Sequence, residues 1–412
     1  MNNDLLLIEK EIKGCFEYFW HEVNTKEGSL GYGLVRDLDG MDMASIAAVG
    51  FALCAYMIGV ERGYVSFEEG YERSLKTLLT VKNNVPHSHG FLAHFVDMNT
   101  LEMLPNSEFS TIDTAILLMG AITAGEYFKG EVKEISTYLA ERCDWDYMIR
   151  NRNGKTQFLM ALFPHNPDYS VYWDHYAEQL MMYILYAGKS DCDTKKARHL
   201  YYDFERNIGS YKGNNMIYCF GNALFIHQFT HAFFDFREYI DERGCDWWQN
   251  SIDATLANRQ FCIDQKWSKT FNECSWGLSA TQTVHGYRVY GAPPFGFECD
   301  YDCQCDGTVT PYAALSSMPF TPKESIEALR YFYGVEGLSG KYGLYDSYNF
   351  DEEKPWITPI YVGIDKGPTI VMLENYLSGT VWKYFMQSEV ATKAIKVLKF
   401  QKRDYQNYNY EK

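Results

Sequence analysis

Apolar positions recur along the chain at intervals of three and four residues, which places them on one face of an α-helix. The pattern predicts about twelve helices, and strand-like alternation is weak. We expect helices at residues 4–23, 43–60, 66–82, 110–128, 130–148, 172–188, 193–207, 222–240, 246–264, 322–334, 368–386 and 389–398. Because a glycine-rich phosphate loop and an alternating strand–helix rhythm are both missing from the sequence, doubly wound folds are disfavoured.

Two of these segments are apolar on nearly every side, which is typical of buried helices. Their sequences are SIAAVGFALCAYMIGV and TIDTAILLMGAITA. Ser110 and Thr111 predict the cap of the fourth helix, and Pro368 predicts the first turn of the helix at 368–386. Helical hairpins with some helices fully buried favour an all-α fold, an (α/α)6 barrel with six inner and six outer helices.

Three long irregular segments interrupt the helices, at 84–109, 149–171 and 266–311. Each is rich in glycine, proline, asparagine, aspartate and aromatic residues. Long structured loops in a helical chain usually carry function, so we expect them to form a cleft on one side of the barrel. No low-complexity linker divides the sequence, which predicts one domain over residues 1–412.

Charge and hydropathy narrow the classes of partner. The chain has 38 Lys and Arg against 54 Asp and Glu, a net charge of −16. This sign argues against binding nucleic acid or an anionic membrane surface. No apolar run reaches the roughly 18–20 residues of a membrane span. The N-terminal LLLI run lacks the basic flank of a signal peptide, so we expect a cytoplasmic protein or a processed form.

Aromatic and cysteine content add two further indications. Aromatic residues make up 17% of the sequence, including 33 Tyr and 9 Trp, which suggests a polar-aromatic groove that stacks on sugar rings. The eleven cysteines run from Cys15 to Cys305, and most stand alone in apolar stretches. We interpret them as reduced core residues of a cytosolic protein. The oligomeric state is left open.

Glu178 is the foremost candidate for chemistry. It follows Asp174 by four residues on one face of the predicted helix 172–188. Trp173 and Tyr176 beside it are typical of a sugar site. Burial at this position would raise its pKa, whereas the helix dipole would lower it. The alternative interpretation is an acid at a helix start that faces water.

Asp113 and Asp365 are two further acids near predicted helix starts, and each has an alternative interpretation as a cap. Glu273 lies in the dense segment 266–311. No GxSxG motif or cysteine nucleophile is visible. Scattered carboxylates among aromatic residues are what glycoside hydrolysis needs, because it uses one acid and one base or nucleophile.

Two groups raise the question of a metal. Cys299, Cys303 and Cys305 match no standard zinc spacing. His227 and His231 are four residues apart, but Gln228 replaces the glutamate of the HExxH motif. We therefore predict no metal site and no cofactor, with the histidines in a hydrogen-bonded polar stripe on the cavity wall. The predicted sugar-binding residues are Trp173, Tyr176, Gln228, His231, Arg237, Trp276, Tyr287, Tyr290, Asp306 and Glu374.

Several stretches of the chain are distinctive when they are taken together. They include SIAAVGFALCAYMIGVERGY, STIDTAILLMGAITAGEYF, HQFTHAFFDFR, DGTVTPYAALSSMPFTP, YGLYDSYNF and GIDKGPTIVMLENYLSG, and they run in order from about residue 43 to 386. With these stretches the chain resembles the glucoamylase-like family that includes bacterial endo-β-1,2-glucanases (glycoside hydrolase family 144) and the transglycosylase domain of cyclic β-1,2-glucan synthases. The resemblance implies an (α/α)6 barrel, a β-1,2-glucan or oligosaccharide substrate, and no metal or organic cofactor.

The resemblance also implies roles for single residues. Glu178 matches the acidic position of the general acid, Asp113 the acid of the STxDTA motif, and Asp365 that of the GIDxGP motif. Glu273 matches an acidic position less closely. The chain departs from the pattern at Lys366, where glutamine is expected, and in the cysteine-rich stretch ECDYDCQCDG.

The leading hypothesis is a glycoside hydrolase acting on β-1,2-linked glucan or its oligosaccharides. The alternatives are a transglycosylase or an exo-acting β-glucoside hydrolase of the same fold, and a non-catalytic carbohydrate-binding barrel. The sequence does not encode the stereochemical outcome, endo or exo action, or the preferred chain length. The stereochemical outcome depends on the carboxylate separation, which is roughly 5–5.5 Å for retention and 6.5–9.5 Å for inversion.

The absence of a recognisable metal motif gives a testable prediction. Glucan hydrolysis should be unchanged after exhaustive treatment with a chelator, because proton transfer between carboxyl groups and substrate needs no Lewis acid. Activity assayed with and without zinc or calcium after chelation checks this. Loss of activity that either ion restores would contradict the prediction.

Overall fold

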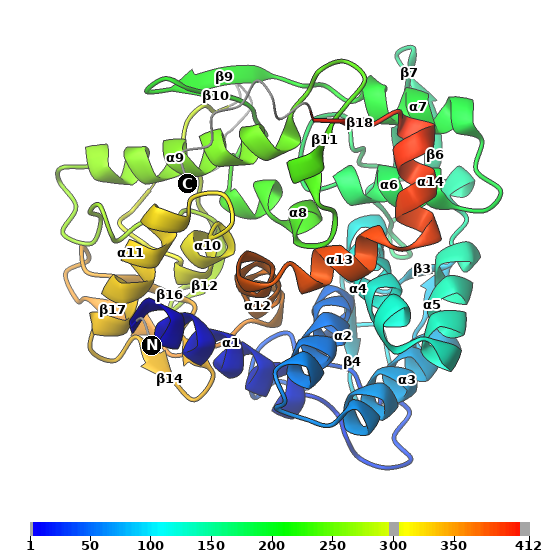
Figure 1. Ribbon diagram of the computed structural model, residues 1–412, viewed down its shortest axis with the longest axis horizontal. Coiled ribbons are helices and arrows are strands. Elements are labelled where there is room, and N and C mark those ends of the chain that lie inside the picture. The colour runs from blue at the N-terminus through cyan, green and yellow to red at the C-terminus, as the bar shows by residue number, and fades with distance from the viewer. Residues whose placement is uncertain (1–2, 296–304, 404–412) are drawn as a thin grey trace.

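The computed structural model describes residues 3–295 and 305–403, and its fold is rich in helices (Figure 1). Its α-helices are α1 (Asn3–His21), α2 (Ile46–Glu61), α3 (Phe67–Asn83), α4 (Thr111–Phe128), α5 (Gly130–Arg142), α6 (Leu180–Gly188), α7 (Thr194–Asp203), α8 (Phe229–Phe233), α9 (Trp247–Asp264), α10 (Pro311–Ser316), α11 (Pro322–Gly334), α12 (Gly363–Leu377), α13 (Thr380–Met386) and α14 (Glu389–Leu398). Three 3₁₀ turns are η1 (Trp145–Met148), η2 (Leu224–His227) and η3 (Phe236–Glu238).

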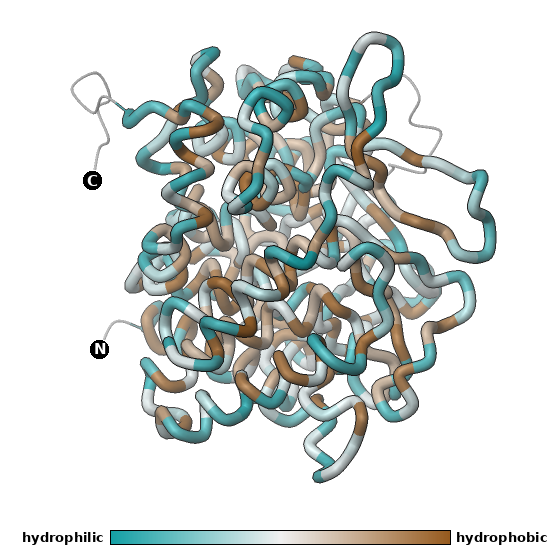
Figure 2. Tube along the Cα trace, turned by 90° about the vertical axis from the view of Figure 1, so that its right-hand side faces the viewer, coloured by the Kyte–Doolittle hydropathy of each residue, from teal (hydrophilic) through white to brown (hydrophobic). Residues whose placement is uncertain are grey.

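Buried and half-exposed helices alternate along the chain. The helices α2, α4, α6, α8, α10 and α12 are buried over nearly their whole length. The helices between them bury one face only, as the period of their apolar residues requires. In Figure 1, α12 lies near the centre and α1, α3, α5, α9 and α11 lie at the perimeter. Figure 2 shows hydrophobic segments gathered inside a largely hydrophilic exterior.

The buried helices α2 and α4 pack at very short range because each has a glycine at the crossing. A Cβ built on Gly120 would lie 1.9 Å from the carbonyl oxygen of Gly50. A Cβ built on Gly50 would lie 2.6 Å from the carbonyl oxygen of Ile116. The absence of side chains at these two positions therefore sets how closely the two helices approach.

The strands are short antiparallel pairs in the connections between helices. They are β1 (Met43–Ser45) with β4 (Phe95–Asp97), β2 (His87–Ser88) with β3 (Phe91–Leu92), β5 (Phe109–Ser110) with β8 (Ala161–Leu162), β6 (Ile149–Arg152) with β7 (Lys155–Phe158), β9 (Ile208–Tyr211) with β10 (Asn214–Ile217), β11 (Tyr239–Ile240) with β18 (Gln401–Lys402), β12 (Ala280–Thr283) with β13 (Gly286–Val289), β14 (Ser339–Gly340) with β15 (Gly343–Leu344), and β16 (Ser347–Asn349) with β17 (Trp356–Thr358). No parallel pair occurs among these named strands.

One connected apolar core runs from Ile8 in α1 to Phe400 after α14. A small second cluster under the β9–β10 hairpin contains Met216 and Tyr218. In the described part of the chain, no helix combines the length and the apolar character needed to cross a membrane. The described cysteines are free thiols.

A buried ion pair joins α12 to α1. The Nζ of Lys366 lies 3.0 Å from Oε1 of Glu11 and 2.7 Å from the carbonyl oxygen of Leu344. Glu11 also accepts hydrogen bonds from the hydroxyl of Tyr333 at 2.7 Å and the amide of Leu344 at 3.0 Å. Lys366, the unexpected residue in the GIDKGP motif, thus forms a buried ion pair with Glu11 and a hydrogen bond with the carbonyl of Leu344.

Several of the predicted helices differ from the structure. The helix predicted at 172–188 starts only at Leu180, because residues before it are extended, with bridges from Tyr172 to Leu159 and from His175 to Glu205. The segment 222–240 is broken into η2, α8 and η3.

The helix predicted at 368–386 was placed too late. Pro368 lies inside α12, which begins at Gly363, where the amides of Asp365 and Lys366 already bond to the carbonyl of Val362. A second helix, α13, takes up the rest of the segment. The short helix α10 was not predicted, because its six residues are too few for a periodic pattern.

The α2–α4 crossing generates a stability prediction. Gly120→Ala should destabilise the protein by roughly 1–3 kcal/mol or more, because the new methyl group forces the two backbones apart. The measurement is the urea midpoint of unfolding. Gly334→Ala is the matched control, since its Cβ would meet nothing within 4 Å. Equal midpoints for Gly120→Ala and wild type would contradict the close packing.

Candidate active site

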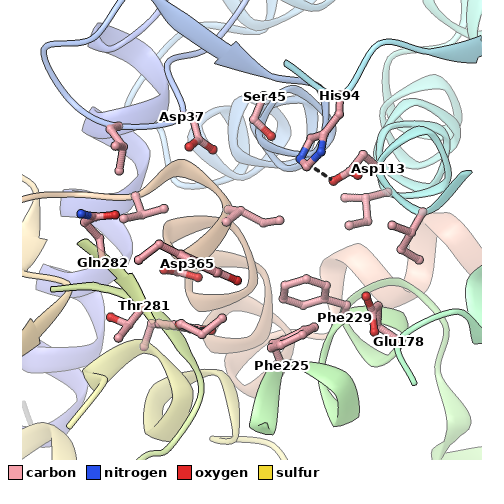
Figure 3. A pocket seen from close by; sticks show the side chains of 18 of the residues that line it. Asp37, Ser45, His94, Asp113, Glu178, Phe225, Phe229, Thr281, Gln282 and Asp365 are labelled. Carbon is pink, nitrogen blue, oxygen red and sulfur yellow. Dashed lines mark hydrogen bonds and ion pairs between the residues drawn. The ribbon is translucent and has the colours of Figure 1, made fainter. Parts of the chain in front are cut away.

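A cavity of about 460 Å³ opens where the buried helices begin (Figure 3). Each of the six buried helices contributes a residue from its N-terminal end or from the turn before it. These residues are Ser45 for α2, Ile112, Asp113 and Ile116 for α4, Glu178 for α6, Phe225 and Phe229 for η2 and α8, Tyr312 for α10, and Ile364 and Asp365 for α12. Because helix N-termini carry partial positive charge, this end of the fold favours acidic groups.

Two of the three long irregular segments complete the wall. Segment 84–109 contributes His94 and Phe95, and segment 266–311 contributes four residues, among them Thr281 and Tyr287. Segment 149–171 does not line the cavity; it supports α4 from behind, where Met160 accepts the hydroxyl proton of Thr111 at 2.6 Å.

Glu178 lies in the turn just before α6, and its carbonyl oxygen accepts a hydrogen bond from the Thr230 hydroxyl at 3.0 Å. Figure 3 places its side chain beside Phe225 and Phe229. Burial raises the pKa of Glu178 to about 7, and the negative charge of Asp113 acts in the same direction. The carboxyl group is therefore available as a proton donor near neutral pH.

Asp113 belongs to a charged network at the start of α4. Its Oδ2 accepts the hydroxyl proton of Ser110 at 2.5 Å, and its Oδ1 lies 3.4 Å from Nε2 of His94. The other imidazole nitrogen of His94 lies 2.8 Å from Oε1 of Glu108. Burial opposes a charge on His94, but Asp113, Glu108 and Asp37 outweigh it and raise the pKa of His94 to about 9.

Among the described residues, His94, Glu108 and Asp113 form the one group whose potential ligand atoms lie close enough together to hold a metal ion. These atoms all lie within 4.8 Å of one another. Each nitrogen of His94 already faces a different carboxylate. The geometry is thus that of an imidazolium held between two acids, which satisfies all three groups without an ion.

Asp365, in the first turn of α12, contacts a second buried acid. Its carboxyl group shares a hydrogen bond with Asp346, which precedes β16. Asp346 Oδ2 accepts the hydroxyl proton of Thr281 at 2.6 Å and the amide proton of Gln282 at 2.7 Å. Burial raises the pKa of both acids, and the charge of Asp346 raises the pKa of Asp365 further.

Asp37 is a further acid that lines the cavity. Its amide donates to the carbonyl of Met43 at 2.8 Å, and its carbonyl accepts from the amide of Gly363 at 2.7 Å. Burial raises the pKa of Asp37 to about 6; His94 lowers it, whereas Asp113 and Asp346 raise it.

The structure brings together four of the residues predicted from the sequence. Glu178, Asp113, Asp365 and Tyr287 line the same cavity. Glu273 does not; it is exposed in a tight turn, where its carbonyl accepts a hydrogen bond from Arg259. The nearby Trp276 is buried, but the sequence alone could not tell whether Glu273 lies in a cavity or on the surface.

The other predicted sugar-binding residues do not line the cavity but support its surroundings. Five are buried and contact neighbouring elements. They are Trp173, whose Nε1 donates to Thr111, Tyr176, which contacts His227, Gln228, which donates to Ala313 and Ser317, His231, which contacts Ser251, and Trp276.

The remaining four form local pairs. Tyr290 donates to Asp306 at 2.8 Å, and Glu374 is buried in an ion pair with Arg62. Arg237 pairs with Asp235 and lies over the ring of Trp382.

The histidines and cysteines that raised the question of a metal lie in different surroundings. Burial lowers the pKa of His227 and of His231 to about 3, and each ring bonds to a different set of neighbours, so the pair forms part of a polar network behind the cavity. Cys299 and Cys303 lie outside the described residues.

Asp37, Asp346 and His94 were missed by sequence reasoning. His94 lies in a segment recognised as functional, and Asp346 lies in the stretch YGLYDSYNF, but neither residue had a local pattern to single it out.

A model of the Glycoamylase family, described as "Putative glucoamylase", matches residues 170–389, which is more than half of the chain. The chain belongs to this family. It is similar to a structure from Bacteroides uniformis, described as a "putative glucoamylase", with 29% identity, a TM-score of 0.85 and coverage of 98% of both chains. It is also similar to the endo-β-1,2-glucanase of Chitinophaga pinensis, with 27% identity, a TM-score of 0.83 and coverage of 97% of this chain and 99% of that one.

A curated relative of this glucoamylase-like chain comes from Parabacteroides distasonis. It is named exo β-1,2-glucooligosaccharide sophorohydrolase (non-reducing end), and the two are 25% identical over 437 residues. The match covers 95% of this chain but 57% of the relative, so the chain spans little more than half of that protein's length.

The raised pKa of Glu178 predicts a pH-dependent stability difference. The ordinary pKa of Glu178 is 4.5, and its pKa in the folded protein is about 7. At pH values between these two, Glu178 has lost its proton in the unfolded chain but retains it in the folded protein. The folded state is therefore penalised as pH rises through this window. Glu178→Gln removes the penalty, so its melting temperature should equal that of wild type near pH 4 and exceed it at pH 8. Glu273→Gln, with an exposed side chain, should show no such trend; a constant difference for Glu178→Gln would contradict the burial argument.

Proposed function

We propose that this protein is a glycoside hydrolase that cleaves β-1,2-linked glucan or its oligosaccharides by carboxyl-group acid–base catalysis. The observation that carries the proposal is the cavity itself. It holds a protonated acid, Glu178, across from several other acids, with apolar side chains between them. This is the equipment that hydrolysis of a glycosidic bond requires.

The architecture supports the same proposal. We infer that the six buried helices form the inner ring of an (α/α)6 barrel; these are α2, α4, α6, α8, α10 and α12. The outer ring then consists of the helices between them, which are α1, α3, α5, α7, α9 and α11. The alternation of buried and half-exposed helices and their common N-terminal cavity support this arrangement. The connected apolar core that extends from α1 to the residues after α14 supports one domain over residues 1–412.

The substrate class is proposed from the relatives. The structure from Chitinophaga pinensis is an endo-β-1,2-glucanase in complex with sophorotriose and glucose. The curated relative from Parabacteroides distasonis is named as an exo-acting hydrolase of β-1,2-glucooligosaccharides. Both names share the β-1,2 linkage and differ in endo or exo action, so linkage is the feature to carry over to this chain.

The proposed chemistry begins with Glu178. Its carboxyl group donates a proton to the glycosidic oxygen as the bond to the anomeric carbon breaks. The rings of Phe225 and Phe229 provide apolar surface for a sugar face and keep the acid partly desolvated. Asp113, which lies 3.4 Å from His94, contributes a carboxyl group near the sugar that becomes cationic in the transition state.

The function is tested by analysing the products that the protein forms from β-1,2-glucan and from its short oligomers. Wild type should release glucose or sophorose-type products; release of one product size from the start indicates exo action, and a ladder indicates endo action. Transfer products at high substrate concentration would favour the transglycosylase. No cleavage of any β-1,2-linked substrate would reject the proposal, and retained glucan binding without cleavage would indicate a binding protein.

Glu178→Gln should lower turnover by about 10²- to 10⁴-fold while glucan affinity is kept, because glutamine preserves shape but donates no acidic proton. Wild-type activity should fall above pH 7, as Glu178 loses its proton, and this alkaline limb should vanish in the residual activity of the variant. Glu273→Gln is the matched control and should retain wild-type turnover. Near-normal turnover of Glu178→Gln would remove Glu178 from the mechanism.

A further inference from the structure

The cavity holds more acids than hydrolysis needs. Asp37, Asp113, Glu178 and Asp365 line it, and Asp346 contacts Asp365. Direct hydrolysis by water requires one proton donor and one base that accepts a proton from the water. With Glu178 as the donor, the hydrogen bonds of the other four acids distinguish which of them is able to serve as the base.

Asp113 is engaged on both oxygens. The Ser110 hydroxyl donates to Oδ2 at 2.5 Å, and the charged imidazole of His94 lies 3.4 Å from Oδ1. Both carboxylate oxygens of Asp113 are thus already in contact with protein partners, which makes them less available to hold a water molecule.

Asp346 and Asp365 occupy each other. Two carboxyl groups in hydrogen-bond contact cannot both be ionised, so the pair retains one proton. Thr281 and Gln282 both donate to Asp346, which places the negative charge on Asp346 and the proton on Asp365. Asp365 therefore holds the proton that it shares with Asp346, so it is not available to accept a proton from water.

Asp37 differs from these acids in its partners. Its side chain accepts no hydrogen bond from any of the described residues, whereas its backbone is fixed between Met43 and Gly363. Figure 3 shows its carboxylate directed into the cavity, on the opposite side from Glu178. A fixed backbone with an unengaged carboxylate leaves room for a water molecule as the hydrogen-bond partner.

Charged and titratable groups from several elements surround Asp37. His94 comes from the loop before β4, Asp113 from α4, Asp346 from the loop before β16, and Asp365 from α12, while Tyr287 from β13 and Tyr18 from α1 also lie near it. The one cation in this set is His94. Its charge favours the ionised form of Asp37, and two of the acids, Asp113 and Asp346, oppose it.

We propose that Asp37 is the general base of this enzyme, a role that rests on the proposed glycosidase function. Asp37 takes a proton from water as the water oxygen bonds to the anomeric carbon. The bond from that carbon to the leaving sugar oxygen breaks, and this oxygen takes the proton of Glu178. Exchange with solvent then returns a proton to Glu178 and removes one from Asp37.

The test measures hydrolysis of a β-1,2-glucooligosaccharide as a function of pH. Wild type should lose kcat/KM below about pH 6, as Asp37 becomes protonated. Asp37→Asn should lower kcat by about 10²- to 10⁴-fold and abolish this acid limb in the residual activity. Asp42→Asn, an exposed acid five residues along the same loop, is the matched control and should keep both rate and profile.

Chemical rescue separates a catalytic role from a structural one. Asp37→Ala leaves space for azide, which attacks the anomeric carbon without needing a base, so azide should restore cleavage and yield a glucosyl azide. Asp365→Ala should show no azide rescue, since Asp365 holds the proton shared with Asp346 and does not act as the base. If Asp37→Asn does not fold, Asp37→Glu serves instead and should keep the acid limb with a lowered kcat, because the longer side chain misplaces the carboxylate.

Any of the following outcomes overturns the proposal: a near-normal rate for Asp37→Asn, an unchanged acid limb in its residual activity, or azide rescue of Asp365→Ala in place of Asp37→Ala. A wild-type kcat for Asp37→Glu would also overturn it. These outcomes are distinct from failure of the proposed function. If the proposed function fails, wild type itself leaves β-1,2-glucans uncleaved. If wild type and Asp37→Asn are both active and Glu178→Gln is inactive, only the role of Asp37 as general base is rejected.

Discussion

The rest of the structure depends on the crowding of acids around one cavity. Like charges in a partly desolvated space repel strongly, so acids can gather there only if the fold compensates each of them. The compensation comes from helix N-termini, the imidazolium of His94, donors such as Thr281, and a proton shared by two carboxyl groups. The convergence of six buried helices with the same end toward the cavity is therefore an electrostatic requirement as well as a packing solution.

The same cavity gives its acids different surroundings. Glu178 lies beside phenylalanine rings, and burial raises its pKa to about 7, whereas Asp113 lies beside the imidazole of His94. Neighbouring groups of one chemical type thus differ in their immediate partners. The difference follows from hydrogen bonds and burial rather than from residue type, so it is set by the loops that supply those partners.

Much of the fold was predictable because buried helices have a strong local signal. The apolar sequences of α2 and α4 placed both helices within a few residues, and the acids near predicted helix starts led to Glu178, Asp113 and Asp365. Asp346 could not be found in this way, because its partner Thr281 lies 65 residues away in sequence. Trp173 and Tyr176 illustrate the opposite error: aromatic residues beside an acid indicate a sugar groove and a packed core equally well.

The ion pair between Lys366 and Glu11 has a consequence for the order in which the protein assembles. Its partners are 355 residues apart, and it fixes the first turn of the helix that carries Asp365. During synthesis the N-terminal half emerges long before Lys366, and Glu11 must wait, solvated, for its partner. The first turn of α12 gains this contact with α1 only after residues 363–377 have been made, so a chain that ends before α12 lacks both the ion pair and Asp365.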